Sequence, residues 1–321
     1  MMKKMGRNLL VIGLAAAVCI TGIAGCSSKT KPYPSETITL VVPASAGGGT
    51  DLTARLWAKY ASEILGQQVV VNNVTGGGGS TGTKTVHDAS PDGYTLLFYH
   101  NTTILNKLAG LADYDHTGFE VGPNFLYDAP CCVFVRADNP YGWKTFEDVV
   151  KTAKEKPGEL TVATEVGSTT YYQYLATQIA TGAEFAIVDG GSNSEKVPGL
   201  LGGAFDIMLN AYTTAGAYVD SGDFLCLGVP TEERCEQFPD VPTFKEQGYD
   251  IVCPGYQFTL FAPKGTGEEI MKVIDETTKK ICEDPKASEE MEQVGYVVDY
   301  IPPKENLEMY NEMIKSYEAL K

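Results

Sequence analysis

From Ile38 onward, short apolar runs of strand length alternate with longer stretches whose apolar residues recur at helical spacing. The runs at 38–43, 69–74 and 94–99 are rich in branched and aromatic residues, which favour strands. Between the first two runs, residues 52–65 place their apolar side chains on one face of a helix. A glycine-rich turn and a short helix separate the second run from the third. This βαβαβ order predicts a parallel sheet covered by helices.

A second series of the same kind begins near residues 131–137 and predicts another α/β unit. Its expected helices span 145–156, 171–180 and 194–203, and its expected strands span 159–165, 184–190, 204–210 and 225–230. After a proline-rich stretch at 239–254, we expect a strand at 258–263 and closing helices at 268–285 and 306–320. Ligands of open α/β sheets bind beyond the carboxyl ends of the strands. We therefore look for a site in the loops after residues 43, 74, 99, 164, 189 and 210.

The N-terminal segment has the pattern of an export signal. Residues 3–7 are basic and residues 9–23 are apolar, a stretch that is short for a membrane span but typical of a secretory signal. Small residues directly precede Cys26, and this arrangement resembles the bacterial lipobox. The resemblance implies a signal peptide over 1–25, lipidation of Cys26, and a polar tether over 26–35. A plain signal cut elsewhere, with Cys26 incidental, is the alternative.

Composition and charge narrow the class of protein. The chain has 321 residues, 43% hydrophobic and 21% charged, which is typical of a folded soluble protein and leaves room for about two domains. It has 41 acidic residues against 25 Lys and Arg, and the segment before Cys26 holds three bases and no acid. Nucleic-acid binding needs clustered cations. We therefore expect no nucleic-acid partner.

Cysteine and histidine usage gives little support for a metal site. The cysteines after Cys26 are Cys131, Cys132, Cys226, Cys235, Cys253 and Cys282, with no CxxC pair, and sequence leaves their pairing open. Cys131 and Cys132 lie in an apolar run, where small buried thiols are the commoner interpretation. The three histidines show no zinc-binding spacing. We expect no metal and no cofactor.

Two glycine-rich loops stand between a strand and a helix. The first contains Gly47, Gly48 and Gly49, and the second runs from Gly76 to Gly79. Glycine allows backbone N–H groups to approach a ligand, and the first N–H groups of a helix favour an anion. Each loop alone is also explained as a tight turn. Two such loops in neighbouring turns favour an anion site. We expect Gly48 and Gly78 to need a positive φ, and a side chain at either would block the approach of the backbone to the anion.

The second loop matches parts of three known motifs. The Gly77-x-Gly79-x-x-Gly82 spacing matches a dinucleotide fingerprint, but no acid follows about 20 residues later. A Walker A site is excluded because Thr83, not glycine, precedes Lys84. The same stretch matches a nucleophile elbow around Ser80, which makes a secreted α/β serine hydrolase the alternative function. Its triad partners would be Asp88 with His100, or Asp113 with His116.

Longer segments resemble one family. ITLVVPASAGGGTDLTARLWAKYASEILGQQVVVNNVTGGGGSTG followed by SPDGYTLLF is similar to the extracytoplasmic, Bug-type receptors of tripartite tricarboxylate transporters. Further matches are KTFEDVVKTAKEKPGELTVAT, GGAFDIML, FPDVPTFKEQGYD and TLFAPKGT, in the same order along the chain. Together they cover about residues 36–300.

The resemblance implies a two-lobed, type II periplasmic-binding-protein-like α/β fold, each lobe a mixed, mostly parallel sheet flanked by helices. Lobe 1 would comprise 36–128 and 256–321, and lobe 2 would comprise 129–255. The resemblance also implies a receptor, not an enzyme, that closes on a small carboxylate and delivers it to an integral membrane permease. We expect a monomer that is attached to the cell membrane through its lipid and has no cofactor.

The same resemblance implies that backbone N–H groups and ordered waters of the two glycine loops hold the ligand carboxylate. The matching residues are Ala46, Gly47, Gly48, Gly49, Thr50, Asp51, Gly77, Gly78 and Gly79. At the ends of other strands we add Tyr99, His100, Asn101, Gly167, Ser168, Thr169, Asp189 and Asn210, and we expect Tyr256 to face the cleft. The sequence after the signal has few arginines, Arg55, Arg136 and Arg234, so a bidentate arginine clamp has few candidates.

Several positions depart from the family pattern and bear on ligand identity. The loop from Thr164 to Thr170 is one residue short, and Asp189 opens a segment that replaces the usual P-Y-K-G. His100 and Asn101 stand where small residues are common, and contact with ligand or with solvent is open for each. Asp189 would repel a second carboxylate and pair with an ammonium group, so we expect an amine-bearing carboxylate rather than citrate. The alternative is that Asp189 only caps the turn after it.

Overall fold

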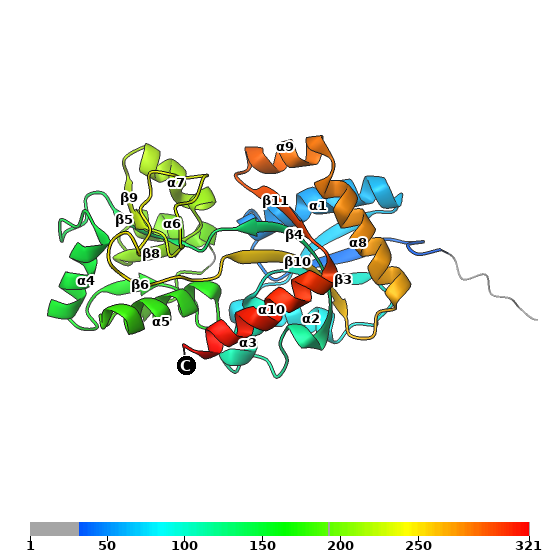
Figure 1. Ribbon diagram of the computed structural model, residues 1–321, viewed down its shortest axis with the longest axis horizontal. Coiled ribbons are helices and arrows are strands. Elements are labelled where there is room, and N and C mark those ends of the chain that lie inside the picture. Colours follow the sequence, from blue (N-terminus) through cyan, green and yellow to red (C-terminus); the bar gives the residue numbers. More distant parts are fainter. Residues whose placement is uncertain (1–31, 192, 321) are drawn as a thin grey trace, which may run out of the picture. The chain divides into compact units, whose positions relative to one another are not determined.

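Six strands form the first sheet, and they come from two separate parts of the chain (Figure 1). The computed structural model describes residues 32–191 and 193–320; the expected signal peptide, Cys26 and the start of the tether lie outside these ranges. The strands are β1 (Ile38–Val42), β2 (Val69–Asn73), β3 (Thr95–Tyr99), β4 (Phe119–Asp128), β10 (Tyr256–Pro263) and β11 (Val297–Ile301). Their order across the sheet is β11-β4-β10-β3-β1-β2.

The second sheet is built from the chain between β4 and β10. Its strands are β5 (Cys132–Arg136), β6 (Thr161–Ala163), β7 (Ala186–Val188), β8 (Ile207–Asn210) and β9 (Phe224–Gly228), in the order β7-β6-β8-β5-β9. The predicted α/β class with two mixed sheets is confirmed. Parallel pairing is confined to β2-β1-β3 and β7-β6-β8, so the sheets are less parallel than expected. Every other pairing is antiparallel and involves β4, β5, β9, β10 or β11.

Helices connect the strands and cover the sheets. They are α1 (Gly49–Leu65), α2 (Ser80–His87), α3 (Thr102–Leu108), α4 (Phe146–Glu155), α5 (Thr169–Thr181), α6 (Asn193–Leu201), α7 (Tyr212–Asp220), α8 (Glu268–Cys282), α9 (Pro285–Gln293) and α10 (Pro303–Glu318). The sequence pattern did not predict β4, β11, α3, α7 or α9. β4 is interrupted by Gly122 and Pro123, and its ladder with β10 is irregular, which hides it from a search for regular strand patterns.

Both faces of the inner strands β1, β3 and β10 are largely buried, which explains why these strands read as nearly continuous apolar runs. In β1, Leu40 and Val42 belong to the core beneath α1 and α8, where Trp57 and Ile274 are buried. The alternate residue Val41 belongs to a second core. That core contains Val86 of α2, Ile104 of α3 and Tyr310 of α10.

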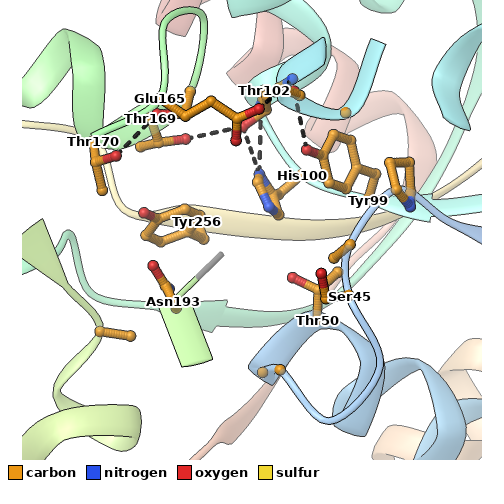
Figure 2. Close-up of a pocket in the computed structure, with 18 of the residues that line it drawn as sticks. Ser45, Thr50, Tyr99, His100, Thr102, Glu165, Thr169, Thr170, Asn193 and Tyr256 are labelled. Atoms are coloured by element: carbon orange, nitrogen blue, oxygen red, sulfur yellow. Dashed lines mark hydrogen bonds between the residues drawn. The ribbon is translucent and has the colours of Figure 1, made fainter. Parts of the chain in front are cut away.

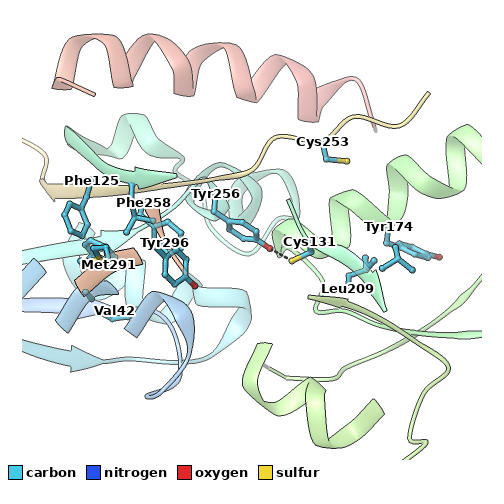
Figure 3. Packing of buried hydrophobic residues seen from close by; sticks show 14 of the residues in the cluster. Val42, Phe125, Cys131, Tyr174, Leu209, Cys253, Tyr256, Phe258, Met291 and Tyr296 are labelled. Atoms are coloured by element: carbon cyan, nitrogen blue, oxygen red, sulfur yellow. Dashed lines mark hydrogen bonds between the residues drawn. The ribbon is translucent and has the colours of Figure 1, made fainter. Parts of the chain in front are cut away.

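The larger core continues from the first sheet into the second (Figure 3). Tyr256 lies at the junction, and its hydroxyl is 3.0 Å from Cys131 Sγ. Cys131 and Cys132 are fully buried, which confirms their interpretation as small core side chains. All six cysteines of the described part are free thiols, and burial raises the pKa of Cys131 to about 12.

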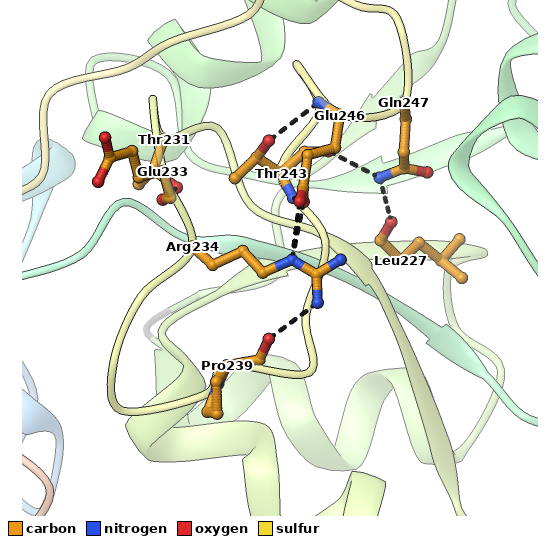
Figure 4. Close-up of polar contacts among 8 residues, drawn as sticks. All are labelled: Leu227, Thr231, Glu233, Arg234, Pro239, Thr243, Glu246 and Gln247. Atoms are coloured by element: carbon orange, nitrogen blue, oxygen red, sulfur yellow. Dashed lines mark hydrogen bonds and ion pairs between the residues drawn. The ribbon is translucent and has the colours of Figure 1, made fainter.

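The segment that returns from β9 to β10 is irregular but held by polar contacts (Figure 4). Arg234 Nε lies 2.9 Å from Glu246 Oε2, and its Nη1 donates to the Pro239 carbonyl at 2.9 Å. Glu246 also accepts from the Thr243 amide at 2.8 Å. The exposed ion pair itself contributes roughly 0–1 kcal/mol. Its main effect is to fix the path of the chain back to the first sheet.

Within 32–191 and 193–320, no helix has both the length and the apolar character required to cross a bilayer. In the same ranges, no three His, Cys, Asp or Glu side chains come together in a way that could hold a metal ion.

Candidate functional site

A cavity of about 320 Å³ lies where loops of both sheets meet (Figure 2). This volume is in the range of small-molecule sites. From the first sheet it is lined by the loops after β1, β2 and β3, and from the second by the loops after β6, β7 and β8. Of the residues predicted for the site, Gly48, Gly49, Thr50, Gly78, Gly79, Tyr99, His100, Ser168, Thr169 and Asp189 line it. Tyr256 lines it as well.

Two helices begin at the cavity, one from each sheet. Gly49 and Thr50 open α1, and Thr169 and Thr170 open α5; all four line the cavity. Within the described ranges, the backbone N–H groups of these four residues have no hydrogen-bond acceptor. Free N–H groups at a helix start carry the positive end of the helix dipole. The two helix starts therefore offer donors to an anion from opposite sides.

The first glycine loop differs in detail from the expectation. Gly48 has a φ of −80°, and a side chain there would meet only ordinary contacts, so the expected need for a positive φ at Gly48 is wrong. Gly49 is the restricted position, because a Cβ on it would lie 2.0 Å from the Tyr296 hydroxyl oxygen. The loop is braced by Asp51, which accepts from the Gly47 amide at 2.8 Å and from Asn73 at 2.8 Å.

The second glycine loop is already engaged by a carboxylate of the protein. Gly78 has a φ of 60°, in the left-handed region, as expected. Its N–H donates to Glu165 Oε1 at 2.6 Å, and its carbonyl accepts from Asn106 at 2.9 Å. Glu165 follows β6, so this bond connects the loops of the two sheets. In this arrangement a side chain, not a ligand, occupies the N–H group of Gly78.

A second contact between the loops involves hydroxyl groups. Thr102 Oγ1 lies 3.1 Å from Thr169 Oγ1 and 3.0 Å from His100 Nδ1 (Figure 2). Burial lowers the pKa of His100 to about 3. The imidazole is therefore neutral at physiological pH and serves the cavity as an aromatic, hydrogen-bonding wall next to Tyr256, whose ring centroid is 4.9 Å away.

Lys196 on α6 is the buried cation of the cavity. Its side chain is 3% exposed, and Nζ has only long contacts, 3.4 Å to the Leu209 carbonyl and 3.5 Å to Thr170 Oγ1. Among the described residues no carboxylate forms an ion pair with it. Burial lowers the pKa of Lys196, whereas the charges of Cys131, Glu165 and Asp189 oppose that shift. A buried ammonium group without a close counter-ion is costly unless an anion joins it.

Asp128 is a partly buried acidic group of the same cavity. It ends β4 and lines the cavity. Burial raises the pKa of Asp128 to about 7, although a hydrogen bond from the Ala129 amide lowers it. No cation of the described residues forms an ion pair with its carboxylate.

Seven residues predicted for the site do not line the cavity: Ala46, Gly47, Asp51, Gly77, Asn101, Gly167 and Asn210. Asn101 is fully buried and donates to the Gly255 carbonyl at 3.1 Å. Asn210 is also fully buried and donates to the Asn193 carbonyl at 2.8 Å, which fixes the start of α6. These amides organise the loops behind the cavity.

The arginines are engaged elsewhere. Arg55 pairs with Asp51, Arg136 pairs with Asp138, and Arg234 pairs with Glu246; none of the three lines the cavity. Burial would raise the pKa of Asp51, but hydrogen bonds from Arg55, Gly47 and Asn73 hold it below its ordinary value.

Asp189 is exposed and lines the cavity, and its Oδ1 accepts from the Gly191 amide at 3.0 Å. This hydrogen bond caps the turn after Asp189, which is the alternative to recognition of an ammonium group. A role for Asp189 in recognising an amine stays a prediction.

The hydrolase alternative requires a histidine beside Ser80. The hydrogen bonds of His100 in the described chain run to Thr102, and those of His116 run to Asn311. Neither candidate triad is assembled among these residues.

Sequence reasoning missed several groups that line the cavity, among them Thr102, Asp128, Glu165, Thr170, Lys196 and Tyr296. Glu165 and Thr170 lie in the loop after residue 164, which is one of the loops expected to carry the site. The rule that ligands bind beyond the carboxyl ends of strands could therefore have found them. Asp128 ends a strand that was not predicted, and Lys196 lies inside a helix, where a buried lysine has no sequence signal.

Comparisons with known proteins agree on one family. The model described as "Tripartite tricarboxylate transporter family receptor" matches residues 53–319. A protein of Cupriavidus necator, named "UPF0065 protein in gbd 5′ region", is 32% identical over 96% of this chain and 94% of its own. BugT of Bordetella pertussis is 31% identical over 84% of this chain and 83% of its own.

Solved structures are similar over both sheets. The periplasmic binding protein BugD has a TM-score of 0.81 and 27% identity, covering 90% of this chain and 97% of its own. MatC from Rhodopseudomonas palustris, solved with bound malate, has a TM-score of 0.82 and 26% identity, covering 90% of this chain and 99% of its own.

The contrast between the two neighbouring glycines is testable. We expect Gly49→Ala to reduce ligand affinity at least tenfold, because its Cβ would displace the Tyr296 ring from the start of α1. Gly48→Ala is the matched control and should retain affinity within about threefold. Isothermal titration calorimetry with malate, succinate, L-alanine, L-leucine and L-glutamate measures both, and equal losses in the two variants would contradict this assignment.

Asp128 predicts a pH-dependent stability of the free protein. Because its folded-state pKa is raised to about 7, the folded state binds this proton more tightly than the unfolded state. Its contribution to stability therefore falls as pH rises from about 4 to 7 and levels off above. We expect Asp128→Asn to raise the free energy of unfolding by about 1–3 kcal/mol at pH 8 and by much less at pH 4. Urea unfolding at both pH values measures the difference, and a gain that is the same at both would contradict the cause.

Proposed function

The chain belongs to the tripartite tricarboxylate transporter receptor family, and from this premise we propose that it captures a small carboxylate outside the cytoplasm and delivers it to a membrane permease. The observation that carries the proposal is the meeting of two helix starts and a buried lysine at one cavity. The free N–H groups at the starts of α1 and α5 and the Nζ of Lys196 are all donors of the kind from which a carboxylate accepts. The malate bound by MatC supports this class of ligand.

Capture involves closure about the connections between the sheets. The chain passes from β4 to β5 through residues 129–131 and returns from β9 to β10 through residues 229–255. In this proposal residues 36–128 and 256–321 move as lobe 1 and residues 129–255 move as lobe 2. The Gly78 to Glu165 bond and the Thr102 to Thr169 bond hold the loops of the two lobes together. Such hinge closure about a ligand needs few residues to change conformation.

Attachment to the membrane completes the proposal. Cys26 follows an export signal and small residues, and a lipid on its thiol would hold the receptor close to its permease. The carboxylate would then pass from the cavity to the permease without diffusing away.

The carboxylate site is tested through Lys196. We expect the purified protein to bind one or more members of a panel of malate, succinate, L-alanine, L-leucine and L-glutamate in calorimetry. Lys196→Met should weaken that binding about 30-fold or more, because it removes the cation that pairs with the ligand anion. The control Lys280→Met removes an exposed lysine of α8 and should change nothing. Failure of every carboxylate to bind would reject the function, and full affinity in Lys196→Met would remove this residue from the site.

The lipid anchor is tested by Cys26→Ser. We expect this variant to leave the membrane fraction, because a stable anchor requires the acyl chains that the thiol would carry. Cys19→Ser, within the apolar stretch of the signal, is the matched control and should remain with the membrane. Fractionation followed by immunoblotting measures both, and a membrane-bound Cys26→Ser protein argues against the anchor.

A further inference from the structure

We propose that the ligand is a zwitterion, and that Asp128, flanked by Tyr256 and Tyr296, receives its ammonium group. This inference rests on the proposed carboxylate-binding function and assigns the opposite end of the same ligand.

The strand register places the three side chains together. Asp128 is the direct antiparallel partner of Tyr256 where β4 meets β10. On the other side of β4, Val297 pairs with Tyr127, so Tyr296 comes beside Asp128. Directly opposed residues of an antiparallel pair project from the same face of the sheet. Asp128, Tyr256 and Tyr296 all line the cavity, so this is the face that meets the ligand.

The surroundings of Asp128 suit a cation. Phe258 follows Tyr256 on the same face of β10 and lines the cavity, and its ring centroid is 6.1 Å from that of Tyr296 (Figure 3). Aromatic faces attract ammonium groups, most strongly when water is excluded. Asp128 supplies the negative charge, and the rings supply the desolvated wall.

Asp128 is also the carboxylate that the protein leaves for a ligand. Glu165 accepts from the Gly78 amide and Asp189 accepts from the Gly191 amide. Among the described residues, Asp128 accepts only from the amide of the next residue, Ala129. A ligand with a second carboxylate would meet these acidic groups and Glu195, and Lys196 is the one lysine among the described residues that line the cavity. An ammonium group instead gives Asp128 its missing partner.

The two ends of the site are close together. The α-carbon of Gly49, at the start of α1, lies against the Tyr296 hydroxyl, and Tyr296 flanks Asp128. The negative charge of Asp128 adds to burial in raising the pKa of Tyr296. A ligand that spans from the donors of α1 to Asp128 therefore carries its opposite charges a few bonds apart, as an amino acid does.

The test compares matched ligands by calorimetry on the purified protein. The pairs are L-alanine with propionate, L-leucine with 4-methylpentanoate, L-glutamate with glutarate, and glycine betaine with its neutral isostere 3,3-dimethylbutanoate. The last pair distinguishes a trimethylated from a primary ammonium group. Mass spectrometry identifies solutes released from the protein as isolated, and any such carboxylate joins the panel with its des-amino analogue.

We expect a zwitterion to bind at least tenfold more tightly than its partner. In Asp128→Asn this preference should disappear, whereas the control Asp250→Asn, an exposed aspartate outside the cavity, should keep it. Affinity of the parent for the zwitterion should also rise between pH 5.5 and pH 8, and Asp128→Asn should show no such rise. Among the described residues, the titratable groups around Asp128 are Tyr127, Cys131, Cys235, Tyr256 and Tyr296, and burial raises the pKa of each, so none of them ionises in this range.

Two results would overturn the inference while leaving the proposed function intact. One is equal or tighter binding of a des-amino acid or a dicarboxylate by the parent protein. The other is an amine preference that survives in Asp128→Asn. Binding of no carboxylate, zwitterionic or otherwise, would instead reject the proposed function itself.

Discussion

The antiparallel pairing of β4 with β10 is the constraint on which the rest of the structure depends. These strands are neighbours inside the first sheet, and the chain between them forms the whole of the second. Gly255, just before β10, allows their backbones to converge, because a Cβ there would lie 2.3 Å from the Asp128 carbonyl oxygen. The pairing ends at Asp128 and Tyr256, at the edge of the cavity. One ladder thus joins the two sheets and positions two groups of the site.

Local dipoles explain how an acidic chain can favour an anionic group. The net charge of −16 is spread over the molecule and is screened beyond about 10 Å in physiological salt. At the cavity, an anion would lie close to the N–H groups that begin α1 and α5 and to the buried ammonium group of Lys196. Water and salt screen these interactions poorly. The three arginines of the described chain contribute nothing there, because each is engaged with a carboxylate elsewhere.

Charged groups that lack a partner reduce stability in the free protein. In the described part of the chain, Lys196 has only long polar contacts, and Asp128 accepts a hydrogen bond from its neighbour's amide alone. Buried side chains that served stability alone would be paired or apolar. Glu165 shows the opposite solution, since its carboxylate is satisfied by the Gly78 amide and at the same time joins loops of the two sheets. A zwitterionic ligand would pair with both Lys196 and Asp128, whose opposite charges lie in one cavity.

The sequence alone determined the elements with regular patterns and the loops that carry the site. The runs of β1 and β3 are largely apolar on both faces, and the glycines after β1 and β2 predicted backbone donors, because these signals depend on neighbouring residues only. Tertiary structure decided which loop residues reach the cavity. Gly49, not Gly48, is restricted, because Tyr296, the residue just before β11, lies against it from almost 250 residues away in the chain. Lys196 and Asp128 acquire their character through burial, and burial depends on packing between distant segments, which no local pattern encodes.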